Sequence, residues 1–169
     1  TNVISITDGQ IFLESDLFFA GMRPAVNVGL SVSRVGGAAQ TKAMKKASGS
    51  IRIDLAQFRE MQVFTQFSSD LDATTKEQLT YGDGLMELLK QPLYHPMSLH
   101  AKVITLCAAT HKEFLDLDKS KIKDFQNGLL EYFDRVHPEI GQEIEAKKTL
   151  TDELIQKILD VTAEYKSKK

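Results

Sequence analysis

The spacing of apolar residues changes near residue 37. Over residues 26–33, apolar side chains alternate with small or polar ones, which is the period of a strand with one buried face. From residue 38 onward, apolar residues recur every three or four positions, which is typical of amphipathic helices. We therefore predict a mainly α fold, in which a strand-and-loop segment over residues 1–37 precedes a multi-helix bundle over residues 38–169.

Capping and turn residues divide the helical part into about six or seven helices. Gly49 stands between two serines and is expected to kink or split the first long helical segment. Residues 74–77, Thr-Thr-Lys-Glu, form a capping-box pattern that predicts a helix start at Thr74. The two glycines in residues 81–84 predict the end of this helix, and a separate short helix is expected over residues 85–91.

The later helices have clearer boundaries. Ser98, Pro138 and Thr151 each mark an expected helix start. Between them lies the most regular apolar stripe of the chain, made of Ile122, Phe125, Leu129, Tyr132 and Val136. Cys107 lies on the apolar face of the helix after Ser98, so we expect it to be a small core residue rather than a reactive thiol.

Composition narrows the class of protein. The chain has 169 residues, of which 42% are hydrophobic, so it can fold around a core without a disulfide or a metal. Its net charge of −2 gives no case for a nucleic-acid partner or a membrane surface. The single cysteine excludes an internal disulfide and suits a reducing compartment. No apolar run approaches the roughly 18 residues of a membrane-spanning helix, so no direct membrane insertion is expected.

Several catalytic motifs are missing from the sequence. There is no Gly-Lys dipeptide, so the chain lacks the Walker A loop that binds nucleotide phosphates. The four histidines lack the spacing of zinc ligands, so no metal site is expected. The serines at positions 5, 31 and 33 lie in no nucleophile-elbow pattern. Composition and spacing alone therefore indicate a mostly helical domain and no specific activity.

One stretch is more specific. Residues 23–40 read Arg-Pro-Ala-Val-Asn-Val-Gly-Leu-Ser-Val-Ser-Arg-Val-Gly-Gly-Ala-Ala-Gln, and this run closely resembles a signature of the alpha subunits of F-type ATP synthases. Shorter runs that resemble the same family are residues 1–11, 55–60, 69–72 and 87–91. The Arg-Pro-Ala and Ser-Val-Ser-Arg elements distinguish alpha from the catalytic beta subunit. The resemblance is dense over residues 1–91 and thins to helical patterning toward the C-terminus.

The resemblance implies a C-terminal fragment of a longer, non-catalytic alpha subunit. Residues 1–37 are then expected to be the last part of a RecA-like nucleotide-binding domain, and residues 38–169 the helical C-terminal domain. The missing Walker A loop follows, because in the family it lies earlier in the nucleotide-binding domain. The parent complex is expected to bind ATP or ADP with Mg²⁺, whereas the isolated fragment is expected to be inactive and to hold no nucleotide tightly.

The resemblance also implies partners and a location. In the family, alpha and beta subunits alternate in a ring around a rotating gamma subunit of the central stalk, and a delta subunit belongs to the peripheral stalk. The complex couples proton or sodium flow across a membrane to ATP synthesis and hydrolysis. The chain is therefore expected to lie peripherally at the cytoplasmic face of a bacterial cell membrane.

Four residues resemble positions at the catalytic interface with beta. Arg34 resembles the arginine finger that alpha inserts into the neighbouring beta site, where a guanidinium can meet two γ-phosphate oxygens at once. Ser31 is expected to take part in catalysis with it, and Ser5 and Val32 to line the same interface. Without the resemblance, Arg34 reads as a solvated loop arginine and the other three as ordinary strand and turn residues.

Three further residues resemble the border of the adenine pocket in alpha's own, non-catalytic nucleotide site: Arg23, Pro24 and Gln91. The sequence departs from the family pattern here, because Leu93 stands where a second glutamine is common. A leucine can still pack against the face of adenine, but it cannot recognise the edge of the base by hydrogen bonds.

Two other classes of protein stay open at this stage. A free-standing helical interaction module would share only ancestry with the family, and its natural N-terminus would carry an initiator methionine. A flagellar export ATPase or a rho-like helicase would share the fold, but the run over residues 31–40 is not expected in them.

Overall fold

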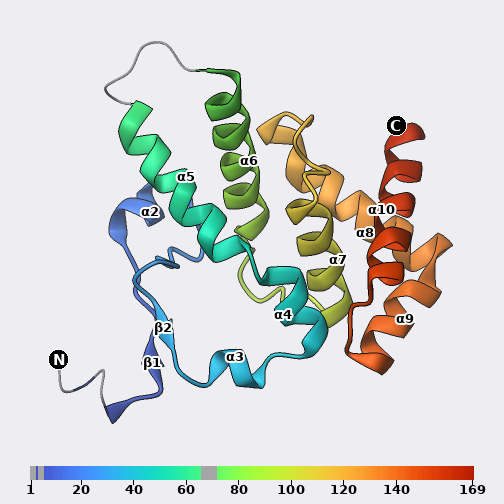
Figure 1. The fold of residues 1–169 in the computed structure, drawn as a ribbon, viewed down its shortest axis with the longest axis horizontal. Helices are drawn as coiled ribbons and strands as arrows, with labels where there is room; N and C mark the ends of the chain where they lie inside the picture. The colour runs from blue at the N-terminus through green and yellow to red at the C-terminus, as the bar shows by residue number, and fades with distance from the viewer. Residues whose placement is uncertain (1–2, 4–5, 66–71) are drawn as a thin grey trace.

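The structure is a computed structural model that describes residue 3 and residues 6–65 and 72–169. An N-terminal segment (residues 6–37) with two short strands lies beside a bundle of helices (Figure 1). Along the chain the elements are β1 (Gly9–Gln10), α2 (Ser15–Phe19), β2 (Val32–Ser33), α3 (Gly36–Ala39), α4 (Lys42–Ser48), α5 (Ile51–Thr65), α6 (Ala73–Leu89), α7 (Leu99–Thr110), η1 (Lys119–Lys121), α8 (Ile122–Val136), α9 (Pro138–Lys147) and α10 (Asp152–Ser167). This order confirms the mainly α fold with a strand-and-loop segment before a helical bundle.

A minimal antiparallel ladder holds the N-terminal segment. Its pairs are Gly9–Ser33, Gln10–Val32 and an isolated bridge between Leu13 and Val26. The prediction of a strand over residues 26–33 is therefore wrong except at its end, where Val32 and Ser33 form β2. A turn replaces its middle, because Asn27 Oδ1 accepts a hydrogen bond from the Leu30 N–H (3.0 Å) and the Asn27 carbonyl accepts one from the Ser31 N–H (3.0 Å). A side chain that bonds to nearby backbone competes in this way with a strand ladder.

Several helix starts follow the expected residues. The hydroxyl of Ser98 accepts from the Ala101 N–H (3.3 Å) at the start of α7. Thr151 does the same for the Leu154 N–H (3.2 Å) at the start of α10, and Pro138 is the first residue of α9. The hydroxyls of Ser98 and Thr151 satisfy backbone donors that a helix N-terminus leaves unpaired, whereas Pro138 has no N–H that needs a partner.

The first long helical segment is split near Gly49 into α4 and α5, as expected. The start of α6 is different from the expected one. Its N-cap is Asp72, whose carboxylate accepts from the Thr75 N–H (3.0 Å), so Asp72 and not Thr74 caps this helix. An ionised carboxylate at this position also interacts favourably with the helix dipole.

Two glycines lie inside α6 instead of ending it. At Gly82, a Cβ atom would come within 2.1 Å of Cδ2 of Phe58, so only glycine lets α5 and α6 approach this closely. At Gly84, the nearest atom to such a Cβ is Cδ1 of Ile122 at 3.5 Å, which is an ordinary contact. The expected break at these glycines is therefore wrong, and α6 continues to Leu89 through the region expected to form a separate short helix.

The core of the bundle is built around α7, which packs against α4, α9 and α10. Val103, Ile104 and Cys107 of this helix are buried. Cys107 is a core residue as expected, and burial raises the pKa of its thiol to about 11, so the thiol stays protonated near neutral pH. The apolar stripe of α8 is buried at its first four positions, whereas Val136 at the end of the helix is 42% exposed.

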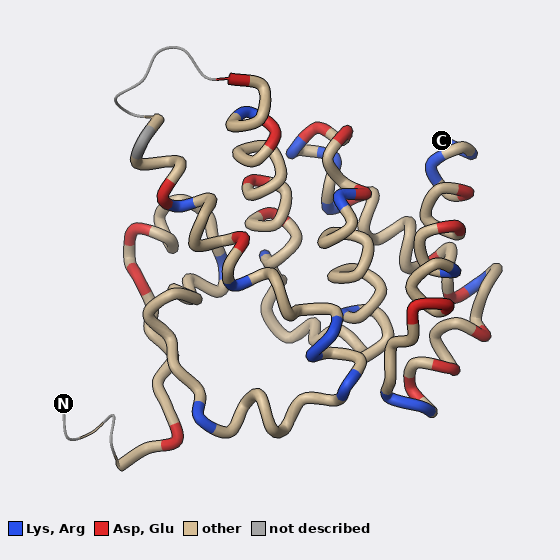
Figure 2. The backbone as a smooth tube through the Cα atoms, in the orientation of Figure 1, with Lys and Arg blue, Asp and Glu red and all other residues tan. Residues whose placement is uncertain are grey.

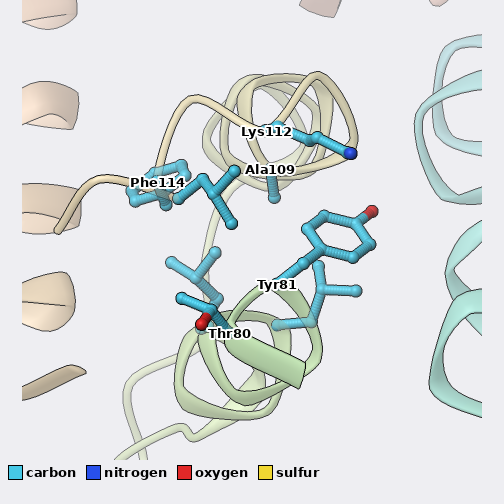
Figure 3. A pocket seen from close by; sticks show the side chains of 9 residues that line it. Thr80, Tyr81, Ala109, Lys112 and Phe114 are labelled. Atoms are coloured by element: carbon cyan, nitrogen blue, oxygen red, sulfur yellow. The ribbon is translucent and has the colours of Figure 1, made fainter. Parts of the chain in front are cut away.

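The seam between α6 and α7 contains a small pocket. Figure 3 shows Thr80 and Tyr81 of α6 facing Ala109 of α7 and, beyond the end of α7, Lys112 and Phe114. Its volume is about 10 Å³, roughly the space of one water molecule, so the pocket is a packing feature rather than a ligand site.

Basic and acidic residues are interspersed along the helices (Figure 2). Some pairs join parts of the chain that are distant in sequence, such as Lys46 Nζ with Asp152 Oδ1 (2.6 Å) and Lys166 Nζ with Glu113 Oε2 (3.1 Å). The exposed pair of Lys46 and Asp152 contributes little to stability. Within the described part of the chain, none of the helices combines the length and hydrophobicity that a membrane crossing requires.

Glu164 on α10 lies among three polar side chains. Its Oε1 accepts from Lys168 Nζ (2.6 Å) and from the Tyr132 hydroxyl (2.6 Å), and its Oε2 lies 3.3 Å from His137 Nε2. These contacts, with that of Lys168 the largest, lower the pKa of Glu164 to about 2. Because the folded pKa lies below the usual value of 4.5, the stabilisation is complete at neutral pH and is lost as the pH falls through this range toward 2.

The Glu164→Gln variant is expected to lose this stabilisation, which the wild type has at neutral pH and loses in acid. Its melting temperature should fall below that of the wild type at pH 7, and the difference should shrink as the pH approaches 2, because Glu164 is then neutral in the wild type as well. Thermal unfolding at a series of pH values measures the difference. Glu131→Gln, on an exposed part of α8, is the control and should show no such pH dependence. A difference for Glu164→Gln that stays constant with pH would contradict the assignment.

The Gly82→Ala variant is expected to be destabilised by about 1–3 kcal/mol, because the added methyl group forces α5 and α6 apart at Phe58. Gly84→Ala is the matched control in the same helix, where the added methyl makes an ordinary contact and the higher helix propensity of alanine stabilises by up to about 1 kcal/mol. Urea unfolding of both variants measures the two free energies. Equal effects of the two substitutions would show that the contact with Phe58 does not require glycine.

Candidate functional site

Arg34 directly follows β2 at the end of the strand ladder. Its backbone N–H donates to the Asp8 carbonyl (2.7 Å), which extends the pairing of β1 with β2 by one hydrogen bond. The residue is exposed, and so is Val35 after it. The backbone of Arg34 is therefore anchored to the other strand while its side chain lies at the surface.

Ser31 and Val32 lie on the approach to Arg34. The Ser31 hydroxyl donates to the Asn27 carbonyl (2.5 Å) and accepts from the Phe12 N–H (3.0 Å), so it bonds within the N-terminal segment. Val32 is 43% exposed. Ser31, Val32 and Arg34 are neighbours in the sequence. In the structure, the serine stabilises the backbone of this stretch and the valine is partly exposed to solvent.

Two groups of predicted residues fall wholly or partly outside the described part of the chain. Ser5, expected at the interface with beta, is one of them, and residues 69–71 of the run that resembles the family are the other. Both stay predictions.

The side chain of Asn27 is buried, with 4% of its surface exposed. Its Oδ1 accepts from Arg59 Nη1 of α5 (2.9 Å) as well as from the Leu30 N–H, and its Nδ2 donates to Glu14 Oε1 (2.6 Å). Arg52, two helical turns before Arg59, donates to the carbonyl of Gly29 (3.3 Å). These contacts join the stretch that leads to Arg34 to the helical bundle, and sequence reasoning did not predict them.

Arg23 and Gln91 meet although they are distant in sequence. The Gln91 N–H donates to the Arg23 carbonyl (2.8 Å), and both residues line a pocket of about 730 Å³. The guanidinium of Arg23 lies over the ring of Phe18, 4.4 Å from its centre. Pro24 follows Arg23 and is exposed, and Leu93 is exposed beyond Gln91. The structure thus brings together the predicted nucleotide-binding residues Arg23 and Gln91.

The lining of this pocket consists mainly of three kinds of side chain. They are the cations Arg23, Lys90 and Lys123, the amides Gln91, Gln126 and Asn127, and apolar residues that include Pro92, Met97 and Leu130; one carboxylate, Glu87, and one imidazole, His95, complete the polar lining. Apolar faces with a few polar groups are typical of sites for planar heterocycles, because the faces of a base pack and its edge forms hydrogen bonds. The residues present therefore fit the base of a nucleotide.

Lys123, at the start of α8, holds one wall of the pocket. Its Nζ donates to the carbonyls of Leu88 (3.0 Å) and Lys90 (2.6 Å) at the end of α6, and to Gln126 Oε1 (2.9 Å). Burial lowers the pKa of this lysine. A lysine that donates hydrogen bonds to the last carbonyls of a helix satisfies groups that the helix itself leaves unpaired. Lys123 therefore fixes the turn that carries Gln91.

Within the described residues, no group of three or more His, Cys, Asp and Glu side chains is arranged to hold a metal ion. The described residues that line the pocket at Gln91 include no serine, threonine or cysteine. The chemistry that these sites offer is the binding of anions and bases by guanidinium, amide and apolar groups.

The fold and the two sites define a helical bundle joined to a short strand-bearing segment with an exposed arginine and a pocket of about 730 Å³. Residues 40–165 match the family described as the ATP synthase alpha/beta chain, C terminal domain. Residues 1–33 match the ATP synthase alpha/beta family, nucleotide-binding domain. The chain therefore belongs to the ATP synthase alpha/beta family.

Three relatives show which branch of the family the chain is similar to. It is 52% identical over 166 residues to ATP synthase subunit alpha of Clostridium acetobutylicum, and 51% identical over 168 residues to that of Caldanaerobacter subterraneus subsp. tengcongensis. The alpha subunit of Clostridium kluyveri is also 52% identical over 166 residues. These matches cover 98–99% of the chain and 33% of each relative, so the chain spans about a third of their length. The resemblance to alpha subunits is confirmed.

The Lys123→Met variant is expected to lose about 1–2 kcal/mol of stability, because the last carbonyls of α6 lose a charged donor while the apolar stem of the side chain is kept. The Gln91 N–H should also exchange faster with solvent, since its turn is no longer held. Urea unfolding and amide hydrogen exchange measure the two effects. Lys121→Met removes an exposed lysine just before α8 and is the control. Equal effects of the two variants on the Gln91 amide would contradict the role of Lys123.

Proposed function

We propose that this chain forms the C-terminal part of a non-catalytic alpha subunit in an F-type ATP synthase, and that Arg34 is the arginine finger which it presents to a neighbouring beta subunit. The observation that carries the proposal is the placement of Arg34: the residue is exposed, directly follows β2, and has its backbone fixed to Asp8. The identity to alpha subunits of about half of all positions supports it.

The need for such an arginine is physical. Transfer of a phosphoryl group spreads negative charge over the γ-phosphate oxygens, and a guanidinium can donate to two of these oxygens at once. The effect of such an arginine depends on its position relative to the phosphate oxygens. When one subunit supplies the arginine and another binds the substrate, turnover depends on how closely the two subunits approach.

Ser31, Val32 and Ser5 have supporting roles in this proposal. Ser31 holds the turn before Arg34 through its bonds to Asn27 and Phe12. Val32 offers an apolar, partly exposed surface at the interface with beta. Ser5 is assigned to the same interface from the resemblance alone.

We assign residues 1–37 to the end of a RecA-like nucleotide-binding domain and residues 38–169 to the helical C-terminal domain. Arg23, Pro24 and Gln91 are proposed to border the adenine of a nucleotide bound at the non-catalytic site, together with Mg²⁺ in the parent complex. The 730 Å³ pocket at Arg23 and Gln91 supports this assignment. The sequence has no Walker A loop, so the isolated chain is expected to bind nucleotide weakly and to have no ATPase activity.

The proposed partners are beta subunits that alternate with alpha in a ring, a gamma subunit in the central stalk and a delta subunit in the peripheral stalk. The proposed complex couples proton or sodium flow to ATP synthesis and hydrolysis. The proposed place of the chain is the cytoplasmic face of a bacterial cell membrane, as a peripheral component.

The Arg34→Ala variant tests the central assignment. In a complex reconstituted from beta, gamma and an alpha subunit that contains this sequence, it should lower ATP turnover by about 10³- to 10⁵-fold, because the charge of the transition state loses its guanidinium partner. Steady-state hydrolysis under saturating ATP measures the loss.

Arg135→Ala removes an exposed arginine from α8 and is the matched control, which should keep the wild-type rate. An Arg34→Ala complex that assembles normally and turns over at the wild-type rate would overturn the proposed function.

A further inference from the structure

We propose that Arg59 of α5 is a positioning residue for Arg34, acting through the buried side chain of Asn27. The inference rests on the proposed function of Arg34 and names the part of the bundle that holds it in place. Arg59 itself lies on α5, outside the strand ladder, and is not expected to touch the nucleotide.

The contact between Arg59 and Asn27 is well defined. Arg59 Nη1 donates to Asn27 Oδ1 over 2.9 Å, and the amide is almost wholly buried. The same Oδ1 accepts from the Leu30 N–H, and the Nδ2 donates to Glu14. A buried amide with all these partners has one favourable orientation, because any rotation leaves polar groups unpaired in a medium of low dielectric constant.

Arg52 provides a second tie on the same side of α5. Its Nη2 donates to the carbonyls of Gly29 (3.3 Å) and Ser31 (3.5 Å). Positions 52 and 59 are seven residues apart, so the two arginines lie about two turns apart on one face of the helix. Two arginines of α5, Arg52 and Arg59, therefore form hydrogen bonds to the turn before β2.

Apolar packing alone does not fix this turn. Val28 packs against the bundle core, but a cavity of about 210 Å³ remains between the turn and α5 and α6, lined mainly by Met22, Val26, Val28, Leu55, Met86 and Leu89. Atoms that face a cavity lack the dispersion contacts that hold a close-packed interior. The hydrogen bonds from the two arginines therefore carry much of the placement of the turn.

A short series of bonds then leads from Asn27 to Arg34. The Asn27 carbonyl accepts from both the N–H and the hydroxyl of Ser31. Val32 and Ser33 follow as β2, and the Arg34 N–H closes on Asp8. Hydrogen bonds tie this stretch at Asn27, Ser31, β2 and Arg34, so a shift of Asn27 is passed to the backbone of Arg34.

The consequence is that the helical bundle sets where the guanidinium of Arg34 is presented. A guanidinium forms its bonds in a fixed plane, which makes Arg59 a stiffer tie than a lysine at the same position. A displacement of about 1 Å at a catalytic group can cost up to about 100-fold in rate. Movement of α5 against the N-terminal segment would thus change turnover without any contact of α5 with substrate.

The test uses the reconstituted complex of beta, gamma and an alpha subunit that contains this sequence. Arg59→Ala is expected to lower kcat by about 10- to 100-fold and to leave the KM for ATP nearly unchanged, because the finger acts in the transition state and not in substrate binding. Arg59→Lys should give an intermediate kcat, since it keeps the charge and loses the planar geometry. Gln57→Ala, an exposed position of the same helix, is the control and should keep the wild-type kcat.

A double-mutant cycle separates this inference from the proposed function. If Arg59 acts through Arg34, then Arg59→Ala should change kcat by less than about twofold in an Arg34→Ala background, because the group it positions is already gone. An equal fall in kcat in both backgrounds would overturn the positioning role while the finger role of Arg34 stands. An Arg34→Ala complex with wild-type kcat would overturn the proposed function, and the inference with it.

A measurement on the 169-residue chain does not depend on assembly. The amides of Leu30 and Ser31 should exchange with solvent faster in Arg59→Ala than in the wild type or Gln57→Ala, while the amides of α7 keep their exchange rates. Unchanged exchange at Leu30 and Ser31 would overturn the inference, because the turn would then be held without Arg59.

Discussion

The buried amide of Asn27 is the contact on which the N-terminal segment depends. Removing a polar side chain from water is costly unless each of its groups finds a partner, and Asn27 finds partners in three places. Glu14 lies before α2, Leu30 lies in the turn before β2, and Arg59 belongs to the bundle. One side chain therefore sets the path of the segment and fastens it to the helices.

The two parts of the chain are stabilised by different forces. The bundle has a continuous apolar core around α7, and the glycine at position 82 lets α5 and α6 approach closely. The N-terminal segment leaves much of its apolar surface exposed, including Ile6, Ile11, Leu13 and Phe19. A two-stranded ladder cannot bury such residues by itself. The segment is therefore held mainly by the hydrogen bonds of Asn27 and by the pairing of β1 with β2. The site of Arg34 thus depends on directional contacts, whereas the pocket at Gln91 is supported by helices.

The sequence predicted the elements whose signals are local. The period of apolar residues placed the bundle, and Ser98, Pro138 and Thr151 marked helix starts correctly. The sequence-based predictions were wrong where a contact with a distant residue, or a side-chain bond within a turn, determines the local structure. The role of Gly82 depends on Phe58, which lies on another helix, and the alternation over residues 26–33 gave no sign that the Asn27 side chain would bond to its own turn.

The candidate site shows the same division. Arg34, Ser31 and Val32 were predicted because they lie in one contiguous run that resembles the family, and Arg23 and Gln91 came from the same resemblance. Their meeting across the fold required the structure. Arg59 and Lys123 were missed, because each acts through acceptors that belong to distant parts of the chain. Asn27, which lies inside an alternating apolar run, was the one sequence feature that indicated such a contact. If this amide is buried, it needs hydrogen-bond partners from elsewhere in the fold.

In the proposed assembly, the bundle holds Arg34 where it can reach a nucleotide on a neighbouring subunit. The most direct measurement is a cryo-electron microscopy structure of the assembled complex with a bound, non-hydrolysable ATP analogue and Mg²⁺. The account predicts that, at a closed catalytic interface, the Arg34 guanidinium lies at a charge-assisted hydrogen-bond distance of about 2.7–2.9 Å from a γ-phosphate oxygen, with the bond between Arg59 and Asn27 intact. A closed interface in which Arg34 points away from the phosphate, or in which Asn27 has left Arg59 while Arg34 remains in place, would contradict it.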